Sequence, residues 1–503
     1  MSLAVFDEEI VTTRAMLDEH PDTRCALLTK VNATHDPMGH RLPVEVVSNI
    51  FQHCLPESPS PDTFQGISKE FKTDHEFFQT TAKLTNVNRN WRDIAHSTPG
   101  LWNSIFLDFT RWSLSEDRLA VLLTNLKQCI QRSGDLLLSI RITAKEDPIL
   151  VLYCVQMLEV LCLEAHRWRS LCISAPRKVI TVISTRPFPK GSPYLDCIIL
   201  NSHNRVTPDD RVLKFDTVRA PLLAPSYLSI RTISFSTSTF DFTRLTYIAL
   251  GSIANSKIVC LLDFWPKLTT LECQLCNDDQ PFSSNPTLTH PSLKTLKLTI
   301  VDAIPNLLSN IILPSLETLI CRFEFSSNAR SILYDFLFHS NSSLRTLSVD
   351  TQCGEQDFIE LLHLTPGLYH LRIHSEITSR FFHYLGETAC LCEDQDVFLP
   401  HLRSIAFSLN IFQEEAFSWS FLRSLVPAIS STGSKCRPLP QVTIYVDNLR
   451  LKLIDRLNLL EFIVGGLEIM VYSKGDYKKK NQLYDYKPLA DALAMLRARS
   501  FPE

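Results

Sequence analysis

The sequence predicts an α/β chain in which an all-helical N-terminal segment precedes an irregular solenoid, a curved parallel sheet with helices on its convex side. Two observations lead to this class. One is the recurring pattern apolar-x-x-apolar-x-apolar, which runs from about residue 137 to residue 407. The other is a pair of amphipathic helical patterns between Leu42 and Trp102. With 503 residues the chain also exceeds one ordinary core, which favours several domains or a repeat array.

The chain divides into four expected parts. Residues 1–36 carry a weak helical pattern and are expected to form a helical arm. Residues 37–106 hold the two stronger helical patterns, with an insertion at 56–80 that is rich in Pro, Ser, Asp and Lys. Residues 107–408 hold the repeats, and 409–503 mix helical and strand patterns. We expect this last part to cover the open end of the stack, as atypical terminal repeats do.

The first amphipathic helix is predicted over the segment LPVEVVSNIF, residues 42–51. Pro43 suits the first helical position, because its φ is fixed near the helical value and its missing N–H would be unpaired there. Apolar residues then recur every three or four positions and predict one apolar stripe on the helix. They are Val46, Val47, Ile50, Phe51 and Cys54.

The second amphipathic helix is predicted from residue 82 to residue 96, before the proline–glycine stop in Ser97-Thr98-Pro99-Gly100. Its apolar positions are Ala82, Leu84, Val87, Trp91, Ile94 and Ala95. Two short helices without a large core of their own need something to pack against. The pair therefore indicates a docking module.

The repeat pattern fits eleven segments, and five successive steps keep a steady period. Their first residues are Leu137, Trp168, Leu195, Ile230, Leu245, Leu268, Leu293, Leu316, Leu344, Leu368 and Leu402. From Leu245 to Leu368 the first positions step by 23, 25, 23, 28 and 24 residues. Leucine-rich repeats have periods of about 20 to 29 residues and this pattern at their heart. We therefore predict one short strand per repeat, followed by a helix or an irregular return.

Several residues are assigned places in this repeat array. A helix is predicted over about Ser115 to Ser133, with Gly134 in a left-handed position at its end. The apolar run Ile149 to Leu163 contains Gln156 and Glu159, is too short for a membrane span and predicts a buried helix. The residues between the strand anchors are expected on the exposed face of the sheet. Examples are Lys294, Thr295, Lys297, Glu317 and Thr318.

Composition narrows the class of partner and the compartment. The net charge of −4 gives no general attraction for nucleic acid, and an apolar content of 45% favours a packed protein. The N-terminus, MSLAVFDEEI, is acidic where a secretory signal is basic. We therefore expect a cytoplasmic or nuclear protein that contacts no membrane and no nucleic acid, with its fifteen cysteines as free thiols.

The sequence predicts no enzyme, and neither a cofactor nor a metal. It contains no G-x-S-x-G elbow, no Walker or dinucleotide glycine loop and no H-E-x-x-H motif. Cys273 and Cys276 have the spacing of a ligand pair, but no second pair follows at a matched distance. The repeat explains them better, with Cys273 at an inward strand position and Cys276 just after the strand.

Three blocks in residues 42–102 together resemble the F-box, especially the F-box-like proteins of fungi. They are LPVEVVSNIF, the run Val87 to Ala95 and Ser97-Thr98-Pro99-Gly100-Leu101-Trp102. The resemblance covers about 60 residues, and the insertion at 56–80 departs from a compact F-box. The residues that match the apolar blocks of the family are candidates for contact with an adaptor. These are Leu42, Pro43, Ile50, Phe51, Leu84, Val87 and Trp91.

Together with leucine-rich repeats, this resemblance implies the substrate-recognition subunit of a Skp–cullin–F-box ubiquitin ligase. The F-box would hold a Skp-family adaptor, and through it a cullin, while the repeats would hold a protein substrate. The alternative is a leucine-rich repeat scaffold that binds protein partners and has no role in ubiquitination. The spacing leaves open which candidates face an adaptor and which hold the two helices together.

Overall fold

A computed structural model describes most of the predicted repeats and the region of the two helices predicted between residues 42 and 96. The described residues are 25–27, 30, 41–55, 80–110, 116–185, 195–202, 224–231, 241–276, 288–300, 307–322, 327–340, 343–350, 355–373, 379–388, 397–409, 441–446 and 468–473. They fall into two compact units, described here separately. The first contains residues 1–204 and 213–223, and the second 205–212 and 224–503. The division falls inside the range 107–408 that the sequence assigns to repeats.

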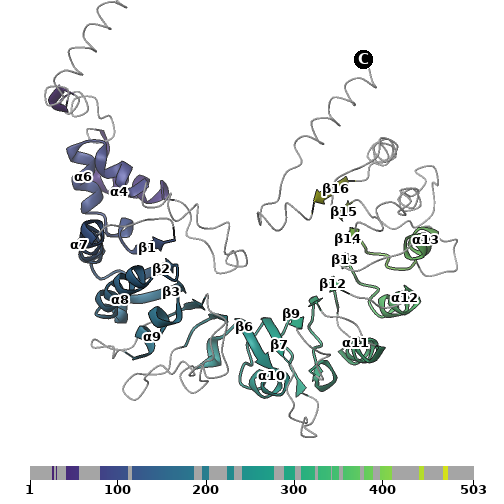
Figure 1. The fold of residues 1–503 in the computed structure, drawn as a ribbon. Coiled ribbons are helices and arrows are strands. Elements are labelled where there is room, and N and C mark those ends of the chain that lie inside the picture. The colour runs from purple at the N-terminus through teal and green to yellow at the C-terminus, as the bar shows by residue number, and fades with distance from the viewer. Residues whose placement is uncertain are drawn as a thin grey trace, which may run out of the picture. The chain divides into compact units, whose positions relative to one another are not determined.

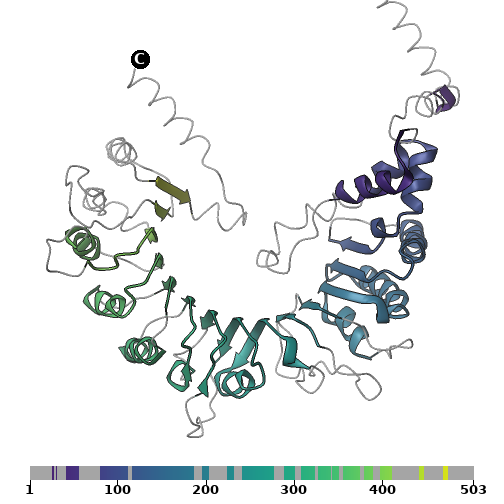
Figure 2. The same ribbon diagram turned by 180° about the vertical axis from the view of Figure 1, so that it is seen from behind.

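The first unit begins with helices and continues with alternating parallel strands and helices. Its elements are α4 (Val44–His53), α6 (Arg89–His96), η2 (Pro99–Leu101), β1 (Ser104–Phe109), α7 (Glu116–Arg132), β2 (Leu138–Ala144), α8 (Pro148–Cys162), η3 (Ala165–Arg167), β3 (Trp168–Ser174), α9 (Arg177–Thr185) and β4 (Cys197–Asn201). Strands β1 to β4 pair in chain order and in parallel. Helices α7, α8 and α9 lie on one side of them (Figures 1 and 2). Gly134, just past α7, has a φ of 55°, as its predicted left-handed position requires.

The strands of the first unit align their apolar residues in columns. Ile140 in β2 pairs with Ile105 in β1 and with Leu171 in β3. Leu171 in turn pairs with Ile198 in β4, and all four side chains are buried. This register confirms the second and third positions of the alignment predicted for the segments that begin at Leu137, Trp168 and Leu195. The first position is wrong at Leu137: Leu138 pairs with Trp168 across a register shift, and Leu137 is 41% exposed.

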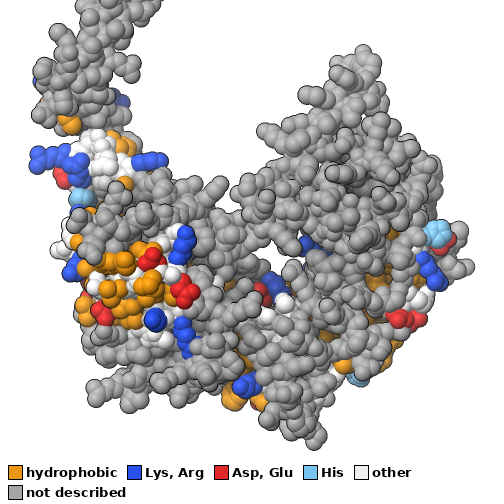
Figure 3. All heavy atoms as spheres, in the orientation of Figure 1, with side chains coloured by type: hydrophobic (Ala, Val, Ile, Leu, Met, Phe, Trp, Pro, Cys, Tyr) orange, Lys and Arg blue, Asp and Glu red, His pale blue; other side chains and the backbone are white. Residues whose placement is uncertain are grey.

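Helix α8 is buried on one face only, which corrects the expectation of a buried helix over Ile149 to Leu163. Its inner face consists of Leu150, Cys154, Met157, Leu158, Leu161 and Cys162. Ile149, Leu152 and Leu163 are 55–59% exposed, and Figure 3 shows hydrophobic side chains gathered over this part of the unit. A helix that is apolar all round carries no periodic signal for its buried side. None of the helices in the described ranges is long and apolar enough to cross a membrane.

The second unit repeats one strand and one return many times. Its elements are β5 (Tyr227–Arg231), η5 (Phe242–Arg244), β6 (Tyr247–Ala254), α10 (Asn255–Leu262), β7 (Thr270–Cys276), β8 (Leu288–Thr289), β9 (Thr295–Ile300), η6 (Leu308–Asn310), β10 (Ile311–Ile312), β11 (Thr318–Arg322), α11 (Ser327–Ser340), β12 (Thr346–Asp350), α12 (Glu355–His363), β13 (His370–Ile373), α13 (Ser379–Glu387), β14 (Ser404–Leu409), β15 (Gln441–Val446) and β16 (Glu468–Ser473). Apart from the small β8–β10 pair, the strands form one parallel ladder in chain order. Helices α10 to α13 lie on one side of it (Figure 1).

Two columns of inward side chains run along this ladder. One passes through Ile248, Leu271, Leu296, Leu319, Leu347, Leu371 and Ile405. The other passes through Leu250, Cys273, Leu298, Cys321, Val349, Ile373 and Phe407. All of these side chains are at least 95% buried. The second and third positions of the predicted pattern therefore occupy the same place in seven successive strands.

The alignment predicted at Ile230 is wrong. Leu228 pairs with Ile248 and Ile230 with Leu250, so β5 uses Leu228 and Ile230 as its two inward residues. The segment around Ile230 contains two overlapping apolar patterns, and strand pairing selects the one that begins earlier. Ile233 and Phe235, which the prediction also used, lie outside the described residues.

The ladder continues past residue 408, where the sequence period fades. The predicted strands at residues 442–446 and 467–472 are confirmed as β15 and β16, which pair in parallel after β14. The helices predicted at 411–429, 449–463 and 489–496 lie outside the described residues, as do nearly all of residues 1–36 and the insertion at 56–80 except its last residue.

Candidate functional site

The candidate site is the helical segment at the start of the first unit. Helix α4 begins at Val44, one residue later than predicted, with Pro43 as its extended N-cap residue. The carbonyl oxygen of Pro43 accepts hydrogen bonds from the N–H groups of Val46 and Val47, at 3.0 and 3.2 Å. Proline thus sets the direction of the chain into the helix without losing a donor that the helix needs.

The second predicted helix is broken in two. Residues 80–86 are helical, and α6 starts at Arg89, so Val87 and Asn88 separate the pieces. The side-chain oxygen of Asn88 accepts a hydrogen bond of 2.7 Å from the N–H of Trp91. Asparagine is among the best N-cap residues, so a new helix start here is favoured over a continuous helix. Apolar spacing alone does not reveal this break.

A small closed core holds the helical segment together. It consists of Val47, Phe51, Leu84, Ile94, Ala95 and Leu101, with Leu55, Trp91 and Trp102 packed against it. The ring centroids of Phe51 and Trp91 are 4.9 Å apart. Burial of each large apolar side chain stabilises such a core by about 1.5–3 kcal/mol.

Polar contacts fix the chain that leaves α6. The hydroxyl of Thr98 lies 2.7 Å from the carbonyl oxygen of Ile94 and 2.9 Å from the hydroxyl of Ser48 in α4. The indole N–H of Trp102 donates to the carbonyl oxygen of Ala95 at 2.7 Å. The Arg132 guanidinium at the end of α7 lies 4.6 Å from the centre of the Trp102 ring. The hydrogen bonds hold the end of the helical segment in place, and the Arg132–Trp102 contact connects it to α7.

The seven candidate adaptor contacts separate into an exposed and a buried group. Leu42 is 39% exposed and Val87 is 40% exposed, and Pro43 is exposed between Leu42 and α4. Exposed apolar side chains of this kind are available to a partner. Their role as adaptor contacts stays a prediction.

Three of the other four candidates, Phe51, Leu84 and Trp91, contribute to the core of the hairpin. Phe51 is fully buried and Leu84 is 7% exposed, both inside the closed core. Trp91 covers that core from outside, and Ile50 is half-buried. The structure thus separates packing positions from accessible ones, which spacing left open.

Sequence reasoning missed two accessible apolar residues on α4. Val44 is 48% exposed and Val46 is 41% exposed. Val46 and Cys54 belong to the apolar stripe predicted for this helix, and both are exposed. Of the five stripe residues, only Val47 and Phe51 are buried. The short helices that pack against α4 are too narrow to cover the whole stripe. The sequence V-E-V-V could have indicated this, because three valines within four residues of a helix cannot all face the same side.

The predicted exposed face of the repeats carries paired charges. The ammonium group of Lys294 lies 3.0 Å from a carboxylate oxygen of Glu317, one repeat further along. Lys297 lies 4.0 Å from Glu272, which also accepts a hydrogen bond of 3.2 Å from the Tyr247 hydroxyl. Thr295 and Thr318 are half-buried between their neighbours. These pairs connect adjacent strands across the sheet.

Cys273 occupies the inward strand position predicted for it and is fully buried in its column. Burial, and secondarily the neighbouring Glu272, raises the pKa of its thiol far above the usual range. Burial likewise raises the pKa of Cys154 on α8 to about 12. Both side chains are therefore protonated at neutral pH and pack as small apolar groups. In the described part of the chain, no three His, Cys, Asp or Glu side chains are grouped to hold a metal ion.

A comparison with models of known protein families finds no match to this chain, and no curated protein matches its sequence. The class of the protein therefore follows from its own fold. It is a mixed α/β protein whose parallel strands and returns repeat along the chain, preceded by a short helical segment.

Proposed function

We propose that this protein is the substrate-recognition subunit of a Skp–cullin–F-box ubiquitin ligase. In this role the helical segment acts as an F-box that binds a Skp-family adaptor, and through it a cullin. The leucine-rich repeats hold a protein substrate. The receptor performs no covalent step, but raises the effective concentration of substrate lysines near a ubiquitin thioester carried elsewhere. Such a receptor works in the cytoplasm or the nucleus.

The observation that carries this proposal is the pattern of exposure at the start of α4. Leu42, Val44 and Val46 expose 39–48% of their surface within five consecutive residues. The core beneath them is already closed by Val47 and Phe51, so these three side chains are not needed to hold the hairpin together. Apolar side chains clustered at a surface indicate a protein partner. They coincide with the LPxEV block that resembles the F-box.

The test is co-purification of the full chain with a Skp adaptor, comparing wild type with a V44D/V46D variant. Both positions lie in the first turn of α4, where negative charge is favoured by the helix dipole, so the helix should remain folded. Apolar anchors at the centre of an interface contribute about 2 kcal/mol or more. We expect the Kd for the adaptor to rise at least roughly thirtyfold.

The matched control is V121D/L152D, which places the same charges on exposed valine and leucine side chains of α7 and α8. This variant should bind the adaptor as wild type does. Failure of folded wild type to bind, or equal loss in both variants, would contradict the proposal and leave a repeat scaffold with no ubiquitin role. Phe51→Ala is unsuitable as a test, because it opens the core and would lower binding for either reason.

A further inference from the structure

A single column of side chains precedes the strands of the second unit. It consists of the residue that follows each first-position leucine: Thr246, Thr269, Lys294, Glu317, Arg345, Tyr369 and Arg403. Each of these residues from Thr269 onward donates its backbone N–H to the carbonyl oxygen of the one before, at 2.8–2.9 Å. Neighbouring members are therefore held about 4.8 Å apart, the spacing of adjacent strands.

The charges of this column are balanced in one half and unbalanced in the other. Lys294 and Glu317 form an ion pair with each other at 3.0 Å. Further along, the guanidinium carbons of Arg345 and Arg403 lie 5.9 and 5.3 Å from the centre of the Tyr369 ring, which lies between them in the column. Both arginines are exposed, and no carboxylate in the described ranges is within ion-pair distance of either. Within the described residues, the result is two positive charges, one on each side of Tyr369, without a carboxylate at ion-pair distance.

A hollow lies against the same residues. Its volume is about 280 Å³, and it is lined by Glu317, Thr318, Arg345, Thr346, Tyr369 and His370. These are the last residue before the strand and the first residue of the strand in three successive repeats. Its one acidic residue, Glu317, is already paired with Lys294. The remaining lining offers threonine hydroxyls, an arginine and an exposed histidine.

We propose that the Arg345–Tyr369–Arg403 cluster and this hollow bind an acidic peptide segment of a protein partner through its carboxylates. The planar guanidinium group matches a carboxylate with two parallel hydrogen bonds, and the tyrosine ring positions both guanidinium groups. An extended peptide with an acidic residue at every second position presents its carboxylates on one side. Assigning that segment to a ubiquitination substrate rests on the function proposed above, whereas the peptide binding does not.

The local chemistry favours an acidic peptide over a nucleic acid. Single-stranded nucleic acid requires free aromatic faces on which bases stack. The ring of Tyr369 already has both guanidinium groups and the His401 ring, at a centroid distance of 5.8 Å and an interplanar angle of 14°, beside it. The chain as a whole is also slightly acidic, with a net charge of −4.

The test uses the full chain without adaptor and measures fluorescence anisotropy with two labelled ten-residue peptides. One alternates Glu and Ser, and the other alternates Gln and Ser. At low salt we expect the glutamate peptide to bind at least tenfold more tightly, and the preference to weaken as salt screens the charges. The R345Q/R403Q variant should lose the preference. The matched control, K257Q/R380Q, removes two charges from exposed residues of α10 and α13 on the helical side and should keep it.

Three results would overturn the inference. These are equal binding of the two peptides by wild type, equal loss in both double variants, and tighter binding of an oligothymidine of the same length than of the glutamate peptide. Retained partial binding by R345K/R403K would support it, because lysine keeps the charge but not the planar fork. Loss of adaptor binding leaves all of these measurements unchanged, so the two proposals can fail separately.

Discussion

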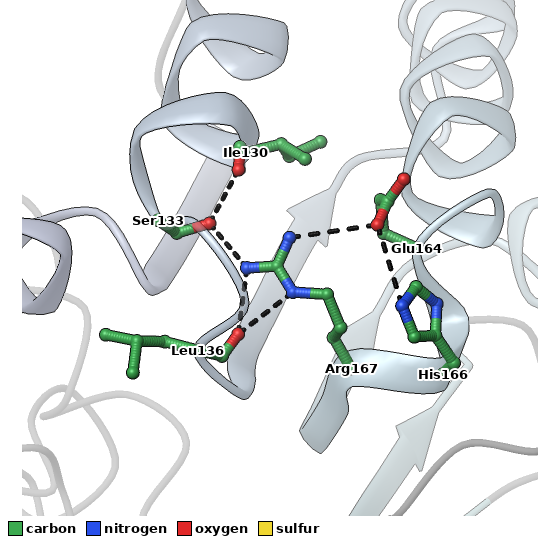
Figure 4. A network of polar contacts seen from close by, with 6 residues as sticks. All are labelled: Ile130, Ser133, Leu136, Glu164, His166 and Arg167. Atoms are coloured by element: carbon green, nitrogen blue, oxygen red, sulfur yellow. Dashed lines mark hydrogen bonds and ion pairs between the residues drawn. The ribbon is translucent and has the colours of Figure 1, made fainter.

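At the scale of single residues, the buried Arg167 connects neighbouring elements of the first unit. Its side chain is nearly buried and donates to the carbonyl oxygen of Leu136 at 2.8 and 3.0 Å and to the hydroxyl of Ser133 at 2.7 Å. Glu164 lies 3.7 Å from it on the other side (Figure 4). Arg167 thereby supplies hydrogen-bond donors to the Leu136 carbonyl and the Ser133 hydroxyl, between the end of α7 and the start of β2.

Replacement of Arg167 by methionine is therefore expected to destabilise the first unit by roughly 2–4 kcal/mol. Methionine keeps most of the packed volume but leaves the Leu136 carbonyl and the Ser133 hydroxyl without their charged donor. Urea denaturation should show a midpoint lowered by about 1 M or more. The exposed Arg89→Met, which removes the same group from α6, should change stability by no more than about 0.5 kcal/mol. Equal effects of both variants would contradict the structural role.

At the scale of elements, the break before α6 determines which surface the helical segment presents. Because α6 starts at Arg89, its buried residues are Ile94 and Ala95, and Val87 remains outside in the connection. In a continuous helix, Val87 and Trp91 would lie four residues apart on the same face, and Val87 would then point toward the side on which Trp91 packs. The cap at Asn88 thus bears on the exposure of Val87, one of the candidate adaptor contacts, whereas Leu42, Val44 and Val46 are exposed at the start of α4.

Asn88→Ala should remove this cap and destabilise α6 by about 1 kcal/mol. Hydrogen exchange measured by mass spectrometry on a peptide covering Arg89–His96 should become roughly fivefold faster. The control is Asn90→Ala, which changes the exposed second residue of α6. It should leave hydrogen exchange in this peptide nearly unchanged. Unchanged exchange in Asn88→Ala would show that the hydrogen bond to Trp91 does not limit the opening of this helix.

At the scale of the whole molecule, stability is shared between neighbouring repeats. The column through Leu319, Leu347 and Leu371 places each leucine in contact range of the next strand, and all three are at least 99% buried. No single strand and return encloses these side chains alone. Stacked repeats therefore stabilise each other mainly through nearest-neighbour interfaces.

Leu347→Ala is expected to cost about 2–5 kcal/mol, because it opens a cavity in the middle of the column. Hydrogen exchange should become faster in β11, β12 and β13, and should remain at its wild-type rate in β1 to β4 of the first unit. Phe338→Ala removes a side chain that is 63% exposed on α11 and should leave exchange in these strands near wild type. Faster exchange throughout both units would instead indicate one cooperative transition.

The sequence by itself determined the repeated strands between Leu245 and Phe407 and the positions of their inward residues. Each repeat has the same local pattern, and stacking identical patterns buries them in the same place. It also determined Gly134 as the end of α7 and Cys273 as an inward strand residue, since both depend on local geometry and spacing.

Only the tertiary structure decided which apolar residues are covered. Val46 and Cys54 match the apolar period of their helix as well as Val47 and Phe51 do, and Ile149 and Leu152 lie in a run that is apolar throughout, yet all four are exposed. The register of β5 and the Arg345–Tyr369–Arg403 cluster likewise depend on which strands lie side by side. Periodicity records how a residue projects from its own helix or strand, whereas burial and side-chain clusters depend on what the rest of the chain places opposite.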